Sequence, residues 1–184
     1  MKLKSKVLII AGSDSSGGAG IQADIKTVTS LGSYAMTAIT AVTSQNTRGV
    51  KAITPIPVKN LQKQITMVLD DIGANAIKIG MLYNTNVIKC VHRILKKSKV
   101  KNIILDPVMV SKGGSRLVNK NSIKHIKKLL LPLCTLVTPN IPEAEALTGY
   151  SIKNRSDMII AAKKIVSMGA KNVLLKGGHL KNKM

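Results

Sequence analysis

Residues 6–27 read KVLIIAGSDSSGGAGIQADIKT, and this stretch predicts a strand, a glycine-rich turn and a helix in immediate succession. The apolar run 7–11 is short, rich in Val and Ile, and followed by glycine, which is typical of a buried strand. From Ile21 the apolar residues follow a helical spacing as far as Gly32. Such a turn at a helix N-terminus either binds an anion through free backbone N–H groups or simply joins the two elements, and these readings are equally good.

Two common nucleotide-binding motifs do not explain the turn. The chain contains no G-x-x-x-x-G-K-[ST] sequence. Gly18, Gly20 and Ala23 fit G-x-G-x-x-A loosely, but that fingerprint needs an acidic residue about 20 residues later to hold a ribose hydroxyl. No Asp or Glu occurs between Asp24 and Asp70. The sequence therefore argues against a nicotinamide dinucleotide site.

The rest of the chain alternates predicted strands and helices. Further strands are expected at 34–46, 76–80, 102–106, 135–138 and 172–176, and helices at 58–69, 84–97, 122–131, after Asn140, and from a Ser156 cap to the residue before Gly169. Pro55 and Pro57 indicate an edge strand or a connection. Apolar strands separated by helices predict an α/β fold with a largely parallel sheet covered on both sides, in a single domain over 1–184.

Polar stretches follow the predicted strands repeatedly, at 12–20, 45–48, 80–81, 106–114, 138–143 and 176–178. Ligands of parallel α/β sheets gather at the carboxyl ends of the strands. We therefore expect the functional site along this edge of the sheet.

The charge balance is strongly basic. The 184 residues include 29 Lys and Arg against 8 Asp and Glu, which gives a net charge of +21. Such a charge is common in proteins that bind nucleic acids or acidic membranes. Here the basic residues are scattered, and the chain has no Phe or Trp and only 3 Tyr on which bases could stack. We expect most lysines on solvated helix faces, and we do not expect nucleic acid as a partner.

The cysteines and histidines carry no motif. Cys90 and Cys134 lie in apolar surroundings, so we expect buried free thiols in a reducing cytoplasm. His92, His125 and His179 are far apart and lack metal-ligand spacing. No apolar run approaches the roughly 20 residues that span a bilayer, and the N-terminal run is too short for a signal peptide. We therefore expect a cytoplasmic protein without a membrane span.

Six blocks of sequence carry a resemblance to a known family. AGSDSSGGAGIQADIKT resembles the N-terminus of the hydroxymethylpyrimidine/phosphomethylpyrimidine kinases, thiamin-biosynthesis enzymes of the ribokinase-like superfamily, and the matches continue in order with AITAVTSQNTRGV, AIKIGMLYN, ILDPVMVSKGG, LVTPNIPEAEALTG and VLLKGGH. The resemblance implies a ribokinase-like three-layer α/β/α fold and a homodimer. It also implies two transfers from ATP, with Mg²⁺: first to the hydroxymethyl group of 4-amino-5-hydroxymethyl-2-methylpyrimidine, and then to the resulting monophosphate.

One group of residues is expected on the pyrimidine side. The Gln45 amide can donate and accept at once, which suits the amino group and adjacent ring nitrogen of an aminopyrimidine, although strand-end hydrogen bonding would also explain it. The resemblance implies pyrimidine contacts at Gln45, Asp24, Gly12, Met81 and Val108. Composition alone would place Met81 and Val108 in the core. For Asp24 the alternative is that its negative charge stabilises the N-terminus of the first helix without contacting a ligand.

A second group is expected on the ATP side. Asn140, Pro142 and Glu143 fit the start of a helix without any further role. The resemblance implies instead an N-x-x-E motif that orders Mg²⁺, its waters and the phosphates, with Glu143 reaching the metal through water. It also implies that Asp106 faces the phosphates and that Lys176 lies beside the nucleotide. A turn cap and an ordinary strand-end lysine are the alternatives for these two residues.

The chain ends at KGGHLKNKM, whereas the resembled kinases continue with a glycine-rich turn that supplies the anion hole and a catalytic Cys or Asp. Gly18, Ala19 and Gly20 are followed by Ile21 and do not replace that turn. We therefore expect a fold truncated at its C-terminus, no catalytic residue in this chain, low kinase activity of the chain alone and an exposed apolar sheet face. Two alternatives remain: a pyridoxal kinase of the same superfamily, and a basic, non-catalytic binding protein that has kept the fold.

Overall fold

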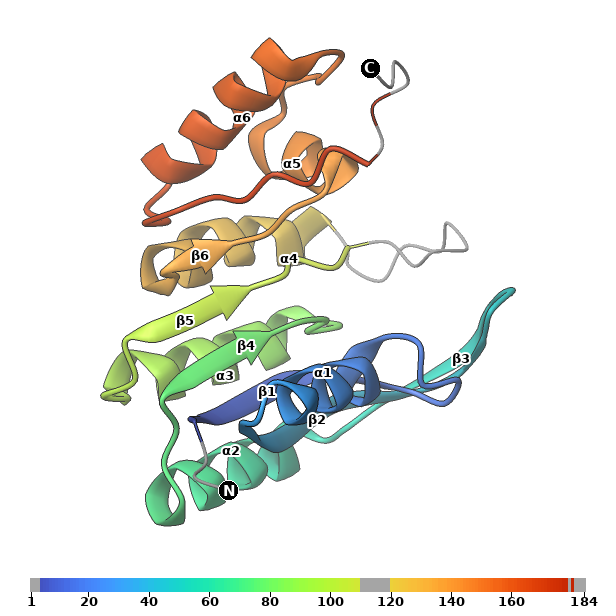
Figure 1. The fold of residues 1–184 in the computed structure, drawn as a ribbon, viewed down its shortest axis with the longest axis vertical. Coiled ribbons are helices and arrows are strands. Elements are labelled where there is room, and N and C mark those ends of the chain that lie inside the picture. The colour runs from blue at the N-terminus through green and yellow to red at the C-terminus, as the bar shows by residue number, and fades with distance from the viewer. Residues whose placement is uncertain (1–3, 110–119, 179, 181–184) are drawn as a thin grey trace.

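The computed structural model describes residues 4–109, 120–178 and 180 (Figure 1). Within them one sheet has the strand order β3-β2-β1-β4-β5-β6. The strands are β1 (Lys6–Asp14), β2 (Tyr34–Asn46), β3 (Gly49–Pro55), β4 (Ala76–Ile79), β5 (Asn102–Leu105) and β6 (Leu136–Val137). Neighbours pair in parallel except β2 and β3, which are antiparallel at the edge. This confirms the predicted α/β class, the largely parallel sheet and the edge strand near Pro55.

The helices connect these strands. They are α1 (Gly20–Ser30), α2 (Val58–Asp71), α3 (Thr85–Lys97), α4 (Lys120–His125), α5 (Ile141–Thr148) and α6 (Arg155–Ser167). The predicted regular helix over 122–131 is wrong in form, because α4 continues as a π-helical turn, Ile126–Leu130, and a 3₁₀ turn, Leu131–Leu133. Pro132 lacks the N–H that a regular α-helix would need to continue.

Different helices cover the two faces of the sheet (Figure 1). Ile9 and Ala11 of β1 pack with Ile21 of α1. Leu8 and Ile10 point to the opposite face, where they join the large core formed with the other helices. Side chains alternate between the faces of a strand, so one apolar run supplies both cores. Among the described helices, α1 alone packs on its face, so both faces are covered as predicted, but unequally.

The strand predicted at 172–176 is not a strand in the described part of the chain. Val173 and Lys176 form only isolated bridges, to Val137 and Asn140 respectively. β6 is two residues long and offers little strand edge on which a partner could extend. Beside it, Leu174 is 58% exposed.

The predicted cap of the last helix is also wrong. Asn154, not Ser156, is the N-cap of α6, and its side chain accepts a hydrogen bond of 2.9 Å from the N–H of Asp157. Asn and Ser are equally good caps, so sequence alone does not separate them. A cap at Asn154 brings Asp157 into the first turn, where negative charge is favourable.

Both cysteines are buried and free, as predicted. Burial raises the pKa of the Cys134 thiol to about 12, and burial also raises the pKa of the Cys90 thiol. Both thiols are therefore held in the unreactive neutral form. No described helix combines the length and apolar character that crossing a membrane requires.

Gly20 offers a test of the turn between β1 and α1. Its φ is +58°, and a Cβ atom there would lie 2.3 Å from the carbonyl oxygen of Gly12. We expect Gly20→Ala to lower the free energy of unfolding by at least about 3 kcal/mol, because backbone strain adds to a clash with backbone that cannot move. Urea denaturation measures the loss.

The matched control is Gly73→Ala, since Gly73 has a φ of +70° but a Cβ atom placed there would have no neighbour within 4 Å. Strain alone should cost it about 1–2 kcal/mol. Equal losses in the two variants would mean that the approach of Gly20 to Gly12 does not constrain the fold.

Candidate functional site

The glycine-rich turn is wound around the carboxylate of Asp14, which is only 3% exposed. Asp14 Oδ1 accepts hydrogen bonds of 2.8 Å from both the N–H and the hydroxyl of Ser16. Asp14 Oδ2 accepts from the N–H groups of Gly18, at 3.1 Å, and Ala19, at 2.8 Å. The N–H groups of Ser16, Gly18 and Ala19, which could have bound an external anion, therefore donate to a carboxylate of the protein itself. For these groups the interpretation as a joining turn is correct and the anion-site interpretation is wrong.

The charge of Asp14 is held in place by this arrangement. Burial on its own raises the pKa of the carboxyl group, but the hydrogen bonds from Ser16, Ala19 and Gly18 outweigh burial and hold the pKa below its ordinary value. The carboxylate lies at the N-terminal end of α1, where the helix dipole also favours negative charge.

The same turn fixes Gln45, at the end of β2. The hydroxyl of Ser15 donates to the Gln45 carbonyl at 2.8 Å and accepts from the Gln45 N–H at 2.9 Å. The hydroxyl oxygen of Thr43 lies 3.2 Å from Gln45 Oε1 and 3.0 Å from the carbonyl oxygen of Ser13. The Gln45 backbone is thus bound to the turn after β1, while its amide is half-exposed at the strand end.

Two other predicted pyrimidine-side residues are in contact. A Cβ on Gly12 would lie 2.5 Å from Met81 Cε, so the buried Met81 side chain packs against the bare backbone of Gly12. The hydroxyl of the buried Thr40 donates to the Met81 carbonyl at 2.7 Å, which fixes the chain just after β4.

Asp24 is held by a partner that the sequence analysis missed. Asp24 Oδ2 lies 2.7 Å from Lys78 Nζ, and both side chains are about a quarter exposed. Asp24 is beyond the first turn of α1, so this ion pair replaces the expected role of a charge at the helix N-terminus. The sequence has 29 basic residues, so no pattern marked Lys78 as the partner of Asp24. Its one signal was its position between Ile77 and Ile79 in a strand predicted to be buried.

Val108 follows β5, and its N–H donates to the Asp106 carbonyl at 2.8 Å. The predicted polar stretch 106–114 is described only as far as residue 109, and residues 110–114 lie outside the described part. Gln45 and Gly12 lie in the last part of β2 and β1, and Met81 and Val108 follow β4 and β5; these four strands are neighbours in the sheet. The structure therefore gathers these residues along the edge that the sequence predicted.

The predicted ATP-side residues form a second group at the ends of β5 and β6. Asp106 Oδ1 accepts from Lys176 Nζ at 2.9 Å and from the hydroxyl of Thr138 at 3.1 Å. Asn140 and Glu143 form a capping box: Asn140 Oδ1 accepts from the Glu143 N–H at 2.9 Å, and Glu143 Oε2 accepts from the Asn140 N–H at 2.8 Å. Thr138 was not identified from the sequence, since an isolated threonine carries no pattern.

Glu143 is a buried acid, only 4% exposed. Burial is the main cause that raises its pKa, and the nearby charge of Asp106 acts in the same direction. The N–H groups of Asn140 and Met109 and the charge of Lys176 oppose this rise only in part. A carboxyl group whose pKa is shifted by both burial and a second carboxylate is typical of functional sites, although capping alone accounts for its hydrogen bonds.

Neither group forms a closed metal cage. Among the residues that the structure describes, no cluster of three or more His, Cys, Asp or Glu could hold a metal ion. Mg²⁺ usually keeps several waters and binds through one or two carboxylates together with substrate phosphates. The neighbouring carboxylates of Asp106 and Glu143 fit a site of that open kind.

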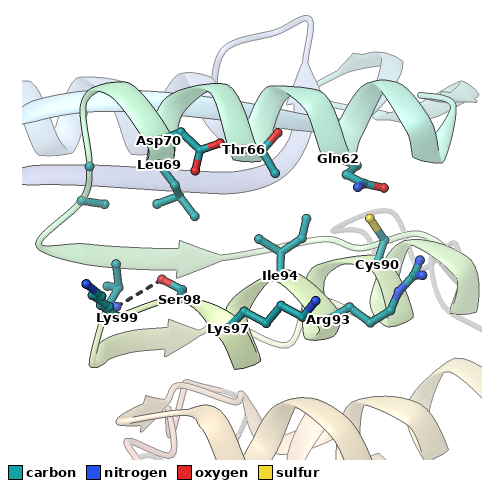
Figure 2. Close-up of a pocket in the computed structure, with 13 residues that line it drawn as sticks. Gln62, Thr66, Leu69, Asp70, Cys90, Arg93, Ile94, Lys97, Ser98 and Lys99 are labelled. Atoms are coloured by element: carbon teal, nitrogen blue, oxygen red, sulfur yellow. Dashed lines mark hydrogen bonds between the residues drawn. The ribbon is translucent and has the colours of Figure 1, made fainter.

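A pocket of about 780 Å³ lies between α2 and α3 and extends to the start of β5 (Figure 2). Its lining includes Thr66 and Asp70 of α2, Arg93 and Lys97 of α3, and residues 98–100 just before β5. None of the predicted site residues lines it. The candidate site is thus a row of strand ends rather than this pocket.

Known proteins resemble this chain over most of its length. Residues 14–184 match the family model described as phosphomethylpyrimidine kinase. A Bacillus subtilis protein named hydroxymethylpyrimidine/phosphomethylpyrimidine kinase is 49% identical over 174 residues, which cover 95% of this chain and 64% of that protein. The chain spans about a third to two thirds of the length of the curated relatives it matches.

Solved structures agree with the sequence matches. The crystal structure of phosphomethylpyrimidine kinase from Clostridium difficile 630 gives a TM-score of 0.91 at 47% identity, covering 99% of this chain and 78% of that chain. The pyridoxal kinase from Staphylococcus aureus in complex with AMP-PCP and pyridoxal gives a TM-score of 0.88 at 39% identity, covering 99% of this chain and 65% of that chain. These likenesses confirm the fold and the resemblance that the six sequence blocks indicated.

Replacing Asp14 tests whether its charge organises the turn. We expect Asp14→Asn to lower the free energy of unfolding at pH 7 by about 2–4 kcal/mol, because an amide has one acceptor oxygen and turns its NH₂ group toward N–H donors. The folded-state pKa of Asp14 is lowered from 3.8, so its contribution is complete above that pH and is lost as the pH falls through the lowered pKa. The difference between wild type and variant should therefore be constant from pH 7 to about 5 and shrink below about 3.8.

Urea denaturation across this pH range measures the difference. Asp70→Asn, at an exposed carboxylate of α2, is the control and should change the free energy of unfolding by no more than about 0.5 kcal/mol. A wild-type advantage over Asp14→Asn that stays the same down to the acid limit would contradict a role for the charge.

Proposed function

This chain belongs to the phosphomethylpyrimidine kinase family, and we propose that it takes part in the ATP-dependent phosphorylation of 4-amino-5-hydroxymethyl-2-methylpyrimidine and of its monophosphate, in thiamin diphosphate synthesis. One observation carries the proposal. Four of the residues that the family resemblance assigns to the pyrimidine lie in or just after the last part of the neighbouring strands β2, β1, β4 and β5, and those assigned to the phosphates lie at the ends of β5 and β6 in the same sheet.

The pyrimidine side offers one polar edge and apolar surroundings. The Gln45 amide presents a donor and an acceptor to the ring nitrogen and the amino group of the substrate. Met81 and Val108 supply apolar surface, and the polarizable thioether of Met81 suits contact with an aromatic ring. Gly12 leaves room beside its backbone, and Asp24, paired with Lys78, completes this side near α1.

The ATP side binds charge. Lys176 offers an ammonium group to the phosphates, and Asp106 holds that group in place through the 2.9 Å ion pair. Asn140 and Glu143 order the phosphates and the waters of Mg²⁺, with Glu143 acting through water. Bound Mg²⁺ would neutralise the charge that develops during transfer. We assign the catalytic base to none of the residues that the structure describes.

We further propose a cytoplasmic homodimer built from one domain per chain. The two free, buried thiols support a reducing compartment. The family resemblance supports the dimer.

Pyridoxal phosphorylation is the second candidate. Its support is the similarity to the Staphylococcus aureus kinase that was solved with pyridoxal, with a TM-score of 0.88. The Gln45 amide favours the pyrimidine, because pyridoxal lacks an amino group next to its ring nitrogen. A basic binding protein without catalysis has only the net charge of +21 in its favour, and a salt-dependent shift of DNA or RNA in a gel would support it.

Calorimetric binding tests the choice of ring. We expect the full chain to bind 4-amino-5-hydroxymethyl-2-methylpyrimidine more tightly than pyridoxal. Gln45→Leu should weaken pyrimidine binding by about 10- to 100-fold, because the polar edge of the ring would lose its partner on leaving water. Gln62→Leu changes an exposed glutamine of α2 that lines the pocket between α2 and α3 and is not among the predicted site residues, and should leave binding unchanged. Tighter binding of pyridoxal would favour the second candidate instead.

Nucleotide binding tests Glu143 without requiring turnover. The affinity for AMP-PCP should rise when EDTA is replaced by Mg²⁺, and Glu143→Gln should reduce that gain about tenfold, because an amide carries no charge for the hydrated metal. The wild-type gain should also fall as the pH drops toward the raised pKa of Glu143, since the protonated acid is neutral. Asp71→Asn, at an exposed position of α2, is the control. An unchanged gain in Glu143→Gln would exclude this role.

A further inference from the structure

Thr43 lies just before Gln45 on β2 and is 5% exposed. Its hydroxyl donates to two acceptors, the Ser13 carbonyl oxygen at 3.0 Å and Gln45 Oε1 at 3.2 Å. A hydroxyl group has one hydrogen to donate and lone pairs that accept. The way Thr43 shares these determines how the Gln45 amide is turned.

Both contacts use the hydrogen of the Thr43 hydroxyl. The Ser13 carbonyl oxygen and Gln45 Oε1 are both acceptors, so Thr43 donates to the two of them in a shared hydrogen bond. The two ends of a primary amide exchange places by a half-turn of the terminal bond, and the surrounding hydrogen bonds decide between the two orientations. Thr43 therefore holds Gln45 Oε1 toward itself and leaves Nε2 on the side away from it.

The backbone of Gln45 is fixed by two further hydrogen bonds. Its N–H and its carbonyl are both bonded to the Ser15 hydroxyl, at 2.9 and 2.8 Å. Ser15 belongs to the turn that the buried Asp14 carboxylate holds together. Thr43 thus controls which end of the Gln45 amide, Oε1 or Nε2, faces β2.

We propose that Thr43 is a specificity-determining residue, because it fixes the order in which the Gln45 amide presents its donor and its acceptor to the ligand. This inference rests on the proposed function, in which Gln45 contacts the ring. Oε1 accepts from Thr43 through one lone pair and keeps the other on the same edge as an N–H of Nε2. That edge matches a ring nitrogen that accepts from Nε2, next to an exocyclic amino group that donates to Oε1. A ring with an oxo group beside a ring N–H carries the reverse pattern and would need the opposite orientation of the amide.

The test compares these two rings on the same protein. The dissociation constants of 4-amino-5-hydroxymethyl-2-methylpyrimidine and of 5-hydroxymethyl-2-methylpyrimidin-4(3H)-one are measured by calorimetry on the full chain. We expect the wild type to prefer the amino compound by about 100-fold or more. Thr43→Val has nearly the same shape but no hydroxyl, so the amide is free to turn, and the preference should fall by at least about tenfold. Thr43→Ser keeps the hydroxyl and should keep the preference.

A ratio of two constants on one variant is insensitive to a general loss of affinity, and thermal unfolding confirms that each variant is folded. Thr43→Ala also lacks the hydroxyl and serves if Thr43→Val fails to fold. An unchanged ratio in both hydroxyl-free variants would overturn the role of Thr43 and leave the proposed function intact. A wild type that binds neither ring would overturn the proposed function itself, and this inference with it.

Discussion

The hydrogen bonds that the Asp14 carboxylate accepts hold together the turn on which the rest of the strand-end site depends. Through this turn Ser15 reaches the backbone of Gln45, and α1 begins where Gly20 passes close to Gly12. The protein supplies the negative charge at this helix N-terminus itself. A phosphate therefore has no vacant set of N–H groups at Ser16, Gly18 and Ala19, and the positive group that we propose for phosphates is Lys176, at the end of β6.

The candidate site is divided along the sheet. The half at β2, β1 and β4 is held by the hydrogen bonds of the Asp14 carboxylate and of Ser15 and by packing of Met81 on Gly12, so its charged groups are already compensated within the protein, Asp24 by Lys78 included. The half at β5 and β6 concentrates charge: Asp106, Lys176 and the buried Glu143 influence one another. This division suits a substrate with a nearly neutral ring and a co-substrate that carries several negative charges. Groups that lose water on binding need a partner in the protein, and the first half offers hydrogen bonds and apolar surface while the second offers charge.

Local patterns predicted much of the fold. The strand at 34–46 and the helix at 84–97 were found because periodicity and a terminal Asn are encoded within the segments themselves. The strand at 172–176 failed because strand formation needs a neighbouring edge, and β6 provides only two residues. Lys78 and Thr138 could not be identified, since their importance comes from partners 54 and 32 residues away. Asp14 lies in the stretch 6–27 that predicted the turn, but its role as acceptor for the N–H groups of that turn depends on how the backbone folds around it.

The order of the strands has a consequence for how the two halves form during synthesis. β1 lies in the middle of the sheet, and Ser15 and Gln45 are only 30 residues apart, so their contact is available once the first 46 residues have left the ribosome. The pairing of Asp106 with Lys176 spans 70 residues and waits until residue 176 has been added. A chain emerges from the ribosome N-terminus first, so the residues around β1, β2 and β4 are available to one another before this ion pair can form. A ribosome that stalls between Val108 and Lys176 would therefore carry the residues that we propose for the ring without the ammonium group that we propose for the phosphates.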